Sequence, residues 1–172
     1  GDVFGAPLAL EGLLAFFLES TFIGLWMFGW DRLPKLVHLG CIWMVVLGTQ
    51  LSAYFILAAN SWMQHPVGYR VNPERGRAEL TDLWAVLTNK VQLVTFPHVV
   101  FAAYMTGGAF VVGVAGWLYL KERFAEDQSL YHSATRTGAW VTLVAGLGVA
   151  VSGDFQGKIM TEVQPMKMAA AE

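Results

Sequence analysis

The chain has 172 residues, of which 55% are hydrophobic and only 14% are charged, and its formal net charge is −2. Soluble domains usually carry about 25% charged residues, so the composition excludes an ordinary water-soluble domain and indicates a membrane protein. The weakly acidic balance, without a basic stripe, argues against a nucleic-acid partner. A single cysteine, Cys41, excludes a disulfide within the chain.

Four apolar runs are each long enough to cross a lipid bilayer, which takes about 20 residues. They cover about residues 4–30, 36–62, 91–120 and 135–152. Short polar links join the first run to the second and the third to the fourth, as in antiparallel helix hairpins. We therefore expect an all-α fold, a transmembrane helix bundle with four spanning helices within residues 1–153.

The first run contains two acidic residues, Glu11 and Glu19, in otherwise apolar surroundings. An ionised acid near the bilayer centre costs several kcal/mol, so two acids in one span indicate a function. On an α-helix, eight residues turn the chain about 80° beyond two full circuits, which puts both acids on roughly one side. That arrangement suits a proton path. The alternative is that burial neutralises the acids or that a neighbouring helix pairs with them.

A longer polar connection, residues 64–90, joins the second run to the third. Prolines and glycines mark turns in it, and several arginines keep it in water. Apolar residues then recur at spacings of three and four: Leu80, Leu83, Trp84 and Leu87. This spacing predicts a short amphipathic helix that lies on the membrane surface.

The orientation of the chain is indicated by its short links. The links at residues 31–35 and 121–136 are dense in Lys and Arg, and the positive-inside rule gives short links the most weight. We therefore expect both short links inside, and residues 64–90 and the polar segment 154–172 outside. The sequence opens on Gly1 rather than Met, so we expect a piece of a longer protein.

His98 lies early in the third run. A histidine that faces lipid is costly, so we expect it to point toward other helices. Neutral imidazole is a good axial ligand for haem iron, but a hydrogen bond to a neighbouring helix explains a membrane histidine equally well. Met105 lies on nearly the same face and so cannot bind the iron from the opposite side. A second ligand would come from another helix, such as Met44, or from outside this stretch.

Several short stretches spread over nearly the whole chain are distinctive in sequence. They are residues 5–12, 16–24, 29–32, 58–64, 96–98, 152–154 and 164–172. Together they resemble subunit I of the cytochrome bd-type quinol oxidases. The resemblance implies a quinol:O₂ oxidoreductase of the prokaryotic cell membrane, which oxidises quinol, reduces O₂ to water and contributes to the proton motive force.

The resemblance also implies cofactors and residue roles. The cofactors are a low-spin haem b, a high-spin haem b and haem d. His98 would be an axial ligand of the low-spin haem b iron, while Glu11 and Glu19 would deliver protons near the high-spin haem pair. Glu11 would be either a ligand at that haem site or a proton donor. Lys167 and Glu172 match a lysine and a glutamate of the quinol-binding loop, so residues 154–172 would begin that loop.

The resemblance further implies partners. These are the remainder of subunit I, an oxidase subunit II, small accessory subunits and membrane lipid, with quinol and O₂ as substrates. The chain would be the middle part of subunit I and active only with the rest. Two other hypotheses remain: a membrane cytochrome b that relays electrons without reducing oxygen, and a proton-coupled transporter without haem.

Overall fold

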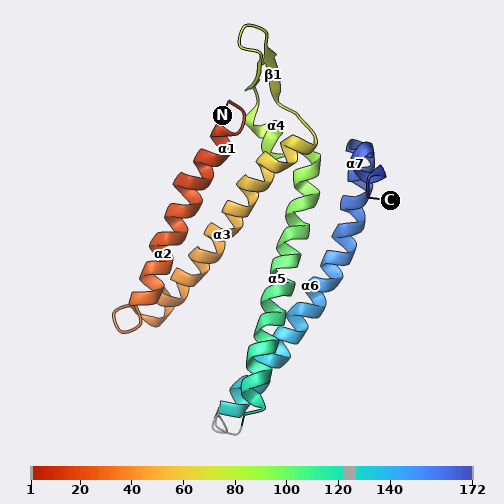
Figure 1. The fold of residues 1–172 in the computed structure, drawn as a ribbon. Coiled ribbons are helices and arrows are strands. Elements are labelled where there is room, and N and C mark those ends of the chain that lie inside the picture. The colour runs from red at the N-terminus through yellow and green to blue at the C-terminus, as the bar shows by residue number, and fades with distance from the viewer. Residues whose placement is uncertain (1, 122–126, 172) are drawn as a thin grey trace. The chain divides into compact units, whose positions relative to one another are not determined.

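The computed structural model describes residues 2–121 and 127–171, and these are predominantly helical (Figure 1). Four helical stretches are long and apolar enough to cross a membrane: Gly5–Phe28, Lys35–Gln64, Lys90–Tyr119 and Gln128–Val163. Even the shortest would be about 36 Å long at 1.5 Å per residue, more than the roughly 30 Å of a bilayer's hydrocarbon core. The expected helical class with four candidate spanning helices is confirmed.

The chain forms two compact units, the first ending at Phe96 and the second beginning at Pro97. The first unit starts with a span of three consecutive segments: α1 (Gly5–Leu10), the π-helical η1 (Glu11–Phe16) and α2 (Phe17–Phe28). This span runs antiparallel beside α3 (Lys35–Gln64), as Figure 1 shows. The carbonyl of Gly29 closes the tight link between them by accepting from the N–H groups of Arg32 and Leu33.

Small side chains line the seam between the first span and α3. Ala15 is fully buried there. Gly48 on α3 lies so close that a Cβ at this position would stand 3.2 Å from both the Ala15 carbonyl oxygen and the Glu19 Cβ. Small residues let helix backbones approach closely, which is how helices commonly pack in membranes.

The connection after α3 contains a β-hairpin, where the sequence predicts only turns. Strands β1 (Tyr69–Asn72) and β2 (Arg77–Leu80) pair antiparallel. In the turn, the Asn72 side-chain oxygen accepts from the backbone N–H groups of Glu74 and Arg75. Gly76 has a φ of 60°, a conformation that glycine adopts without strain. The turn residues are thus a sequence signal, while the strands are too short to show a pattern.

The short helix that follows, α4, covers only Leu83–Leu87. Asp82 caps it by accepting a 3.1 Å hydrogen bond from the Ala85 N–H. Leu80, which the spacing places on this helix, instead ends β2, so the helix is shorter than expected. The helix still has an exposed side and a buried side, because Trp84 is 72% exposed and Val86 is fully buried. Its position on a membrane surface stays a prediction.

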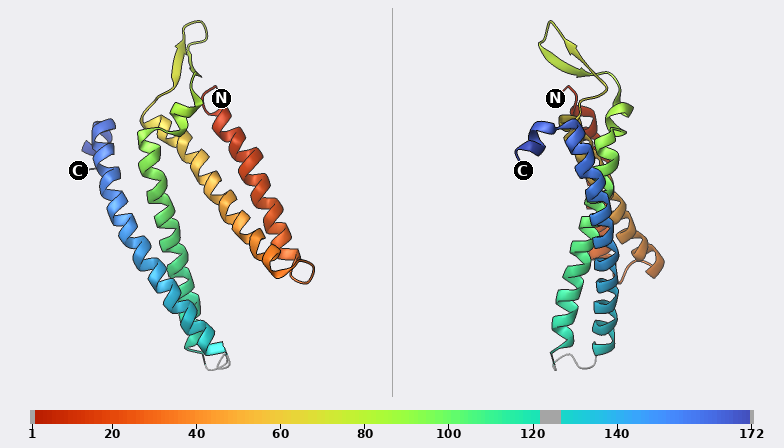
Figure 2. Two further views of the ribbon diagram at one scale, coloured as in Figure 1. Left: turned by 180° about the vertical axis from the view of Figure 1, so that it is seen from behind. Right: turned by 90° about the vertical axis from the view of Figure 1, so that its right-hand side faces the viewer.

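The helix α5 (Lys90–Tyr119) begins in the first unit and makes up the start of the second unit from Pro97 onward. There it lies antiparallel beside α6 (Gln128–Val163), and the two helices are side by side in both views of Figure 2. The helix α5 continues through Pro97 without a break. The helices approach closely at Gly108 and Gly138, where a Cβ on Gly138 would stand 2.9 Å from the Gly108 carbonyl oxygen.

The helix α6 continues to Val163, beyond the expected end at residue 152. Residues 154–163 are therefore helical, whereas the sequence predicts the start of a loop. A 2.6 Å ion pair between Lys158 and Asp154, one turn apart, supports the added turns. A short helix, α7 (Pro165–Ala169), follows directly.

Candidate functional site

Glu11 begins η1 and its side chain is directed toward α3. Its carboxylate accepts a 2.9 Å hydrogen bond from the hydroxyl of Ser52, on α3. Glu11 is only 8% exposed, so this acid is buried between two largely apolar helical segments. An acid in a membrane span is tolerated when it has a polar partner, and a hydroxyl can both donate and accept. The pair can therefore hold a proton or pass one on.

Glu19 lies on the same side of the first span as Glu11. Its Cβ is 3.2 Å from where a Cβ on Gly48 would stand, and Gly48 is one turn from Ser52 on α3. Both acids therefore face α3. The π-helical segment between them contributes, because its residues turn the chain by a smaller angle and reduce the offset of about 80° expected on an α-helix. Such segments are frequent at functional sites.

His98 lies on α5 and its ring is directed toward α6. The ring nitrogen Nδ1 is 3.0 Å from the hydroxyl oxygen of Ser152. The same hydroxyl is 2.6 Å from the carbonyl oxygen of Gly148, one turn earlier on α6. Within the residues that the structure describes, the other ring nitrogen, Nε2, has no hydrogen-bond partner.

The surroundings of His98 fit an axial ligand of haem iron. Gly153 leaves room for the ring, since a Cβ there would stand 3.3 Å from the His98 Cε1. Histidines that bind metals usually hold one ring nitrogen in a hydrogen bond and bind with the other. His98 has this arrangement, with Nδ1 held by Ser152 and Nε2 available. The protein donors present therefore match the chemistry of haem iron.

The other predicted site residues lie elsewhere. The sulfur of Met105 is 3.6 Å from the Cβ position of Gly146 on α6, so Met105 faces the same helix as His98, as their spacing predicts. Met44 lies on α3, and its role as a second ligand stays a prediction. Lys167 is exposed on α7, and Glu172 lies outside the described residues.

Two serines that sequence reasoning does not single out, Ser52 and Ser152, are partners of the predicted site residues. A serine within an apolar run is common in helix packing, so its residue type alone carries no signal. Ser152 does fall in residues 152–154, one of the stretches that carry the family resemblance. For Ser52, only the pairing of the first span with α3 reveals the acid that it contacts.

A buried polar cluster joins the end of α3 to the start of α5. The side chain of Gln92, fully buried, accepts from the Ser61 hydroxyl at 3.2 Å and donates to the Tyr54 carbonyl at 2.8 Å. Asn89, 3% exposed, donates to the His65 carbonyl at 2.7 Å. These amides have protein partners, so we interpret the cluster as structural, a clamp between two spans.

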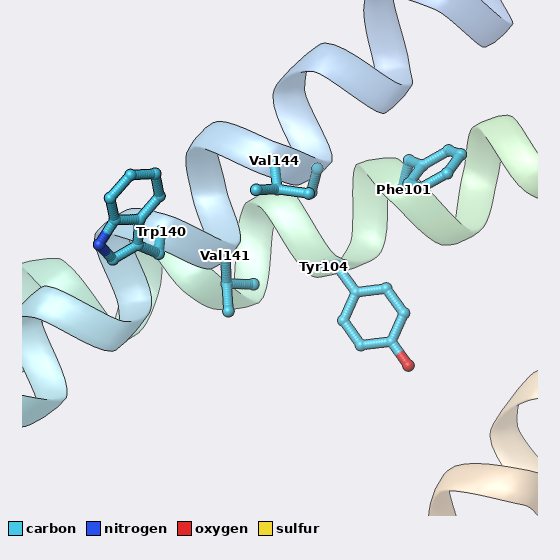
Figure 3. Close-up of a pocket in the computed structure, with 6 residues that line it drawn as sticks. Phe101, Tyr104, Trp140, Val141 and Val144 are labelled. Atoms are coloured by element: carbon cyan, nitrogen blue, oxygen red, sulfur yellow. The ribbon is translucent and has the colours of Figure 1, made fainter.

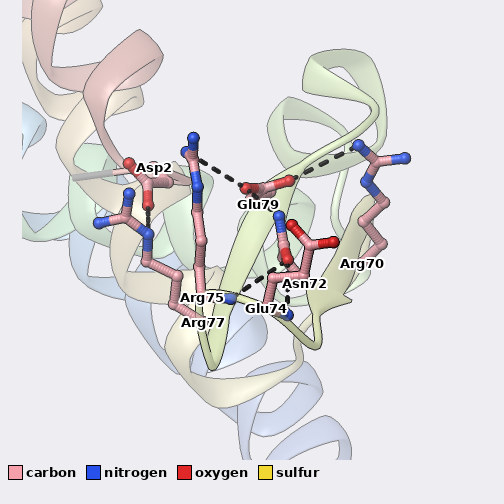
Figure 4. Close-up of polar contacts among 7 residues, drawn as sticks. All are labelled: Asp2, Arg70, Asn72, Glu74, Arg75, Arg77 and Glu79. Atoms are coloured by element: carbon pink, nitrogen blue, oxygen red, sulfur yellow. Dashed lines mark hydrogen bonds and ion pairs between the residues drawn. The ribbon is translucent and has the colours of Figure 1, made fainter.

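Charged side chains around the hairpin pair with one another (Figure 4). Glu79 lies 3.6 Å from Arg70 and 3.7 Å from Arg75, while Arg77 pairs with Asp2 at 2.6 Å. Ion pairs exposed to water contribute about 0–1 kcal/mol each. The hairpin is thus a solvated element whose charges are largely mutually balanced.

An open apolar groove of about 350 Å³ lies between α5 and α6 (Figure 3). It is lined by Phe101, Tyr104, Trp140, Val141, Val144 and Ala145. The Tyr104 phenol is the only titratable group of this lining, so the groove offers apolar contact rather than chemistry. Such an exposed apolar surface needs lipid or protein to cover it, which agrees with two membrane-spanning helices.

The chain is similar to known proteins along its whole length. A sequence model of the family described as "Cytochrome bd terminal oxidase subunit I" matches residues 1–172. The chain is 52% identical over 172 residues to "Cytochrome bd ubiquinol oxidase subunit 1" of Bacillus subtilis (strain 168), covering 100% of this chain and 36% of that protein. It is 42% identical over 172 residues to "Cytochrome bd-II ubiquinol oxidase subunit 1" of Escherichia coli (strain K12), covering 100% and 33%.

A solved structure shares the fold. It is described as "The structure of bd oxidase from Geobacillus thermodenitrificans", with a TM-score of 0.86 and 29% sequence identity. The match covers 100% of this chain and 39% of the other. The chain spans about a third of the length of these curated relatives.

Proposed function

We propose that this chain, which belongs to the cytochrome bd terminal oxidase subunit I family, is the middle part of a haem-bearing subunit that oxidises quinol and reduces O₂ to water. The observation that carries the proposal is the family match over residues 1–172, on a chain with four candidate spanning helices. Because the chain spans about a third of its relatives, activity requires the remainder of subunit I. An oxidase subunit II and small accessory subunits complete the assembly in a prokaryotic cell membrane.

In this proposal His98 is an axial ligand of the low-spin haem b. Haem, when bound, supplies one-electron transfer. The chain would hold the haem iron through the imidazole of His98, with Nε2 free to bind and Nδ1 held by the hydrogen bond to Ser152. The high-spin haem b and haem d would take further ligands from parts of the subunit outside this chain.

Glu11 and Glu19 deliver protons to the high-spin haem pair. Reduction of O₂ consumes protons, and a dry interior needs protonatable groups to bring them. The hydrogen bond from Ser52 to Glu11 supports this role, because it gives the buried acid a partner that can exchange a proton. A carboxylate oxygen can also bind iron, so Glu11 has two candidate roles. Glu11→Gln separates them: loss of haem indicates a ligand, and loss of turnover with haem retained indicates a proton donor.

Lys167 and Glu172 bind quinol on the outer side of the membrane. Quinol oxidation releases protons together with electrons, so a base such as Glu172 is useful, and a cation such as Lys167 can hold a quinone oxygen. Lys167→Gln should then raise the KM for quinol. Lys158→Gln, which removes an exposed cation from α6, is the matched control and should leave the KM unchanged.

Reduced-minus-oxidised spectra of the assembled complex test the whole proposal. We expect b-type bands and a d-type band in the far red, together with quinol-dependent O₂ consumption. Bands of b type alone would instead support an electron relay, and a spectrum without haem bands would support a transporter. His98→Ala should remove the low-spin b signal while the protein stays in the membrane. His132 lies near the start of α6, and His132→Ala should leave that signal intact. A low-spin signal that survives His98→Ala would contradict the ligand assignment.

A further inference from the structure

We propose that Ser152 is a positioning residue that holds the hydrogen of the His98 ring on Nδ1 and so leaves the Nε2 lone pair free for iron. The inference rests on the proposed role of His98 as a haem ligand. It adds a residue on α6, 54 positions from His98 in the sequence, that determines which nitrogen of the ring can bind iron.

The Ser152 hydroxyl has a single hydrogen to donate. The oxygen of this hydroxyl is 2.6 Å from the carbonyl oxygen of Gly148. Two oxygen atoms this close need a hydrogen between them, and a carbonyl has none to give. The hydrogen of Ser152 is therefore donated to Gly148. Toward His98, at 3.0 Å, the hydroxyl can only accept.

The tautomer of His98 follows from this assignment. If the hydroxyl can only accept, Nδ1 must carry the hydrogen of the neutral ring, and Nε2 keeps its lone pair. The opposite tautomer would set two acceptors against each other at 3.0 Å. The bond from Ser152 to Gly148 also polarises the hydroxyl and makes it a better acceptor.

The helix pair fixes the position of the ring as well as its hydrogen. Two glycines of α6, one on either side of Ser152 in the sequence, leave space for side chains of α5. A Cβ on Gly148 would stand 2.6 Å from the ring of Phe101, and a Cβ on Gly153 would stand 3.3 Å from Cε1 of His98. A side chain at position 148 would clash with Phe101, and one at position 153 would crowd the His98 ring. With Phe101 and His98 seated in this way, the imidazole is held against α6 beside Ser152.

The hydrogen bond has a consequence that can be measured on the haem. An imidazole that donates its N–H to an acceptor is a stronger electron donor to the metal. A stronger donor favours ferric over ferrous haem. Loss of the Ser152 hydroxyl should therefore shift the reduction equilibrium of the low-spin haem b toward the ferrous form. We expect a change of up to about tenfold, which is about 59 mV for a one-electron couple.

The test is a potentiometric titration of the low-spin haem b in the full-length subunit, assembled in its complex. Ser152→Ala should raise the midpoint potential. Ser152→Thr keeps a hydroxyl and should return the potential to that of the parent. Thr142→Ala is the matched control, because it removes a hydroxyl of α6 that makes the same backbone hydrogen bond, to Gly138 at 2.8 Å, away from His98. Its potential should equal that of the parent.

The outcomes separate this inference from the proposed function. If His98→Ala leaves the low-spin signal, the ligand assignment itself fails. If His98→Ala removes the signal but Ser152→Ala keeps the parental potential, only the role of Ser152 is overturned. Where Ser152→Ala does not retain haem, Ser152→Thr decides: haem retained at the parental potential supports the inference, and loss of haem in both variants overturns it.

Discussion

The hydroxyl of Ser52 donates a 2.9 Å hydrogen bond to the Glu11 carboxylate and so links α3 to the π-helical segment η1. Two interpretations of this contact remain distinct. In one, the bond only satisfies a buried acid, as pairing with a neighbouring helix requires. In the other, the acid exchanges protons and the hydroxyl assists. The two interpretations predict different turnover when Glu11 is replaced by glutamine, an amide of nearly the same shape.

Glu11→Gln should slow O₂ consumption by the assembled oxidase more than it lowers haem content. Glutamine can still accept the hydrogen bond from Ser52, but it cannot release a proton. Ser52→Ala should slow turnover less, by about tenfold or below, because a typical hydrogen bond contributes about 0.5–1.5 kcal/mol. Turnover and haem spectra of the same preparation are the measurement.

Thr49→Ala is the matched control for Ser52→Ala. Thr49 lies on the same helix, and its hydroxyl donates only to the Val45 carbonyl, at 3.0 Å. Its removal should leave turnover unchanged. Equal turnover in Glu11→Gln and the parent would show that Glu11 has a purely structural role.

Glu19→Gln should also slow O₂ consumption while the haem content stays near that of the parent. Glu19 faces α3 at Gly48, one turn from Ser52, so it is placed to pass protons along the same seam as Glu11. Glu74→Gln, in the exposed turn of the hairpin, makes the same chemical change outside the spans and should have no effect. If both variants turn over like the parent, Glu19 carries no protons that limit the rate.

The four long helices can be predicted from the sequence because membrane spans are set by length and composition, which need no knowledge of contacts. The acids Glu11 and Glu19 can be predicted to share a side for a similar reason, since both lie on one helix. The π-helical segment that brings them closer together cannot be predicted, because no residue type in it distinguishes a π-helical turn from an α-helical one.

Two features differ from the sequence prediction: α6 extends beyond residue 152, and residues 69–80 form a hairpin. Both differences have physical causes. Gly153 and Asp154 suggest a helix end, but the ion pair between Asp154 and Lys158 stabilises another turn. The hairpin strands have only four residues each, half of them polar, so their period-two alternation is too brief to stand out from chance. Contacts such as Ser152 with His98 join residues 54 positions apart, and only the packing of α5 on α6 creates them.

Asn89→Ala should lower the melting temperature of the assembled protein. Asn89 is buried, and its side chain donates to the His65 carbonyl at 2.7 Å. Removing the Asn89 amide leaves this half-buried carbonyl without its donor, which costs up to about 1–3 kcal/mol. Thermal unfolding followed by haem absorbance gives the measurement. The neighbouring Thr88→Ala removes an exposed hydroxyl that bonds only to the Trp84 carbonyl, and it should melt like the parent.

Gly108→Ala should disturb the packing of α5 on α6 more than the same change one residue earlier. A Cβ on Gly108 would stand 2.9 Å from the Gly138 carbonyl oxygen and 2.9 Å from the Thr142 nitrogen, both backbone atoms that cannot turn away. The helices must then separate, and such overpacking costs about 1–3 kcal/mol. We expect a lower melting temperature and, because His98 lies on the same helix pair, weaker retention of the low-spin haem b.

Gly107→Ala is the control that isolates this contact. The two glycines are adjacent on α5, but a Cβ on Gly107 meets nothing within 4 Å, so the added methyl group points into open space. Alanine also restricts the unfolded chain more than glycine does, so the variant should be at least as stable as the parent. Equal melting temperatures for Gly107→Ala and Gly108→Ala would show that the close approach at Gly138 does not hold these helices together. A drop confined to Gly108→Ala would assign the loss to backbone crowding rather than to the loss of glycine flexibility, since both variants lose that flexibility equally.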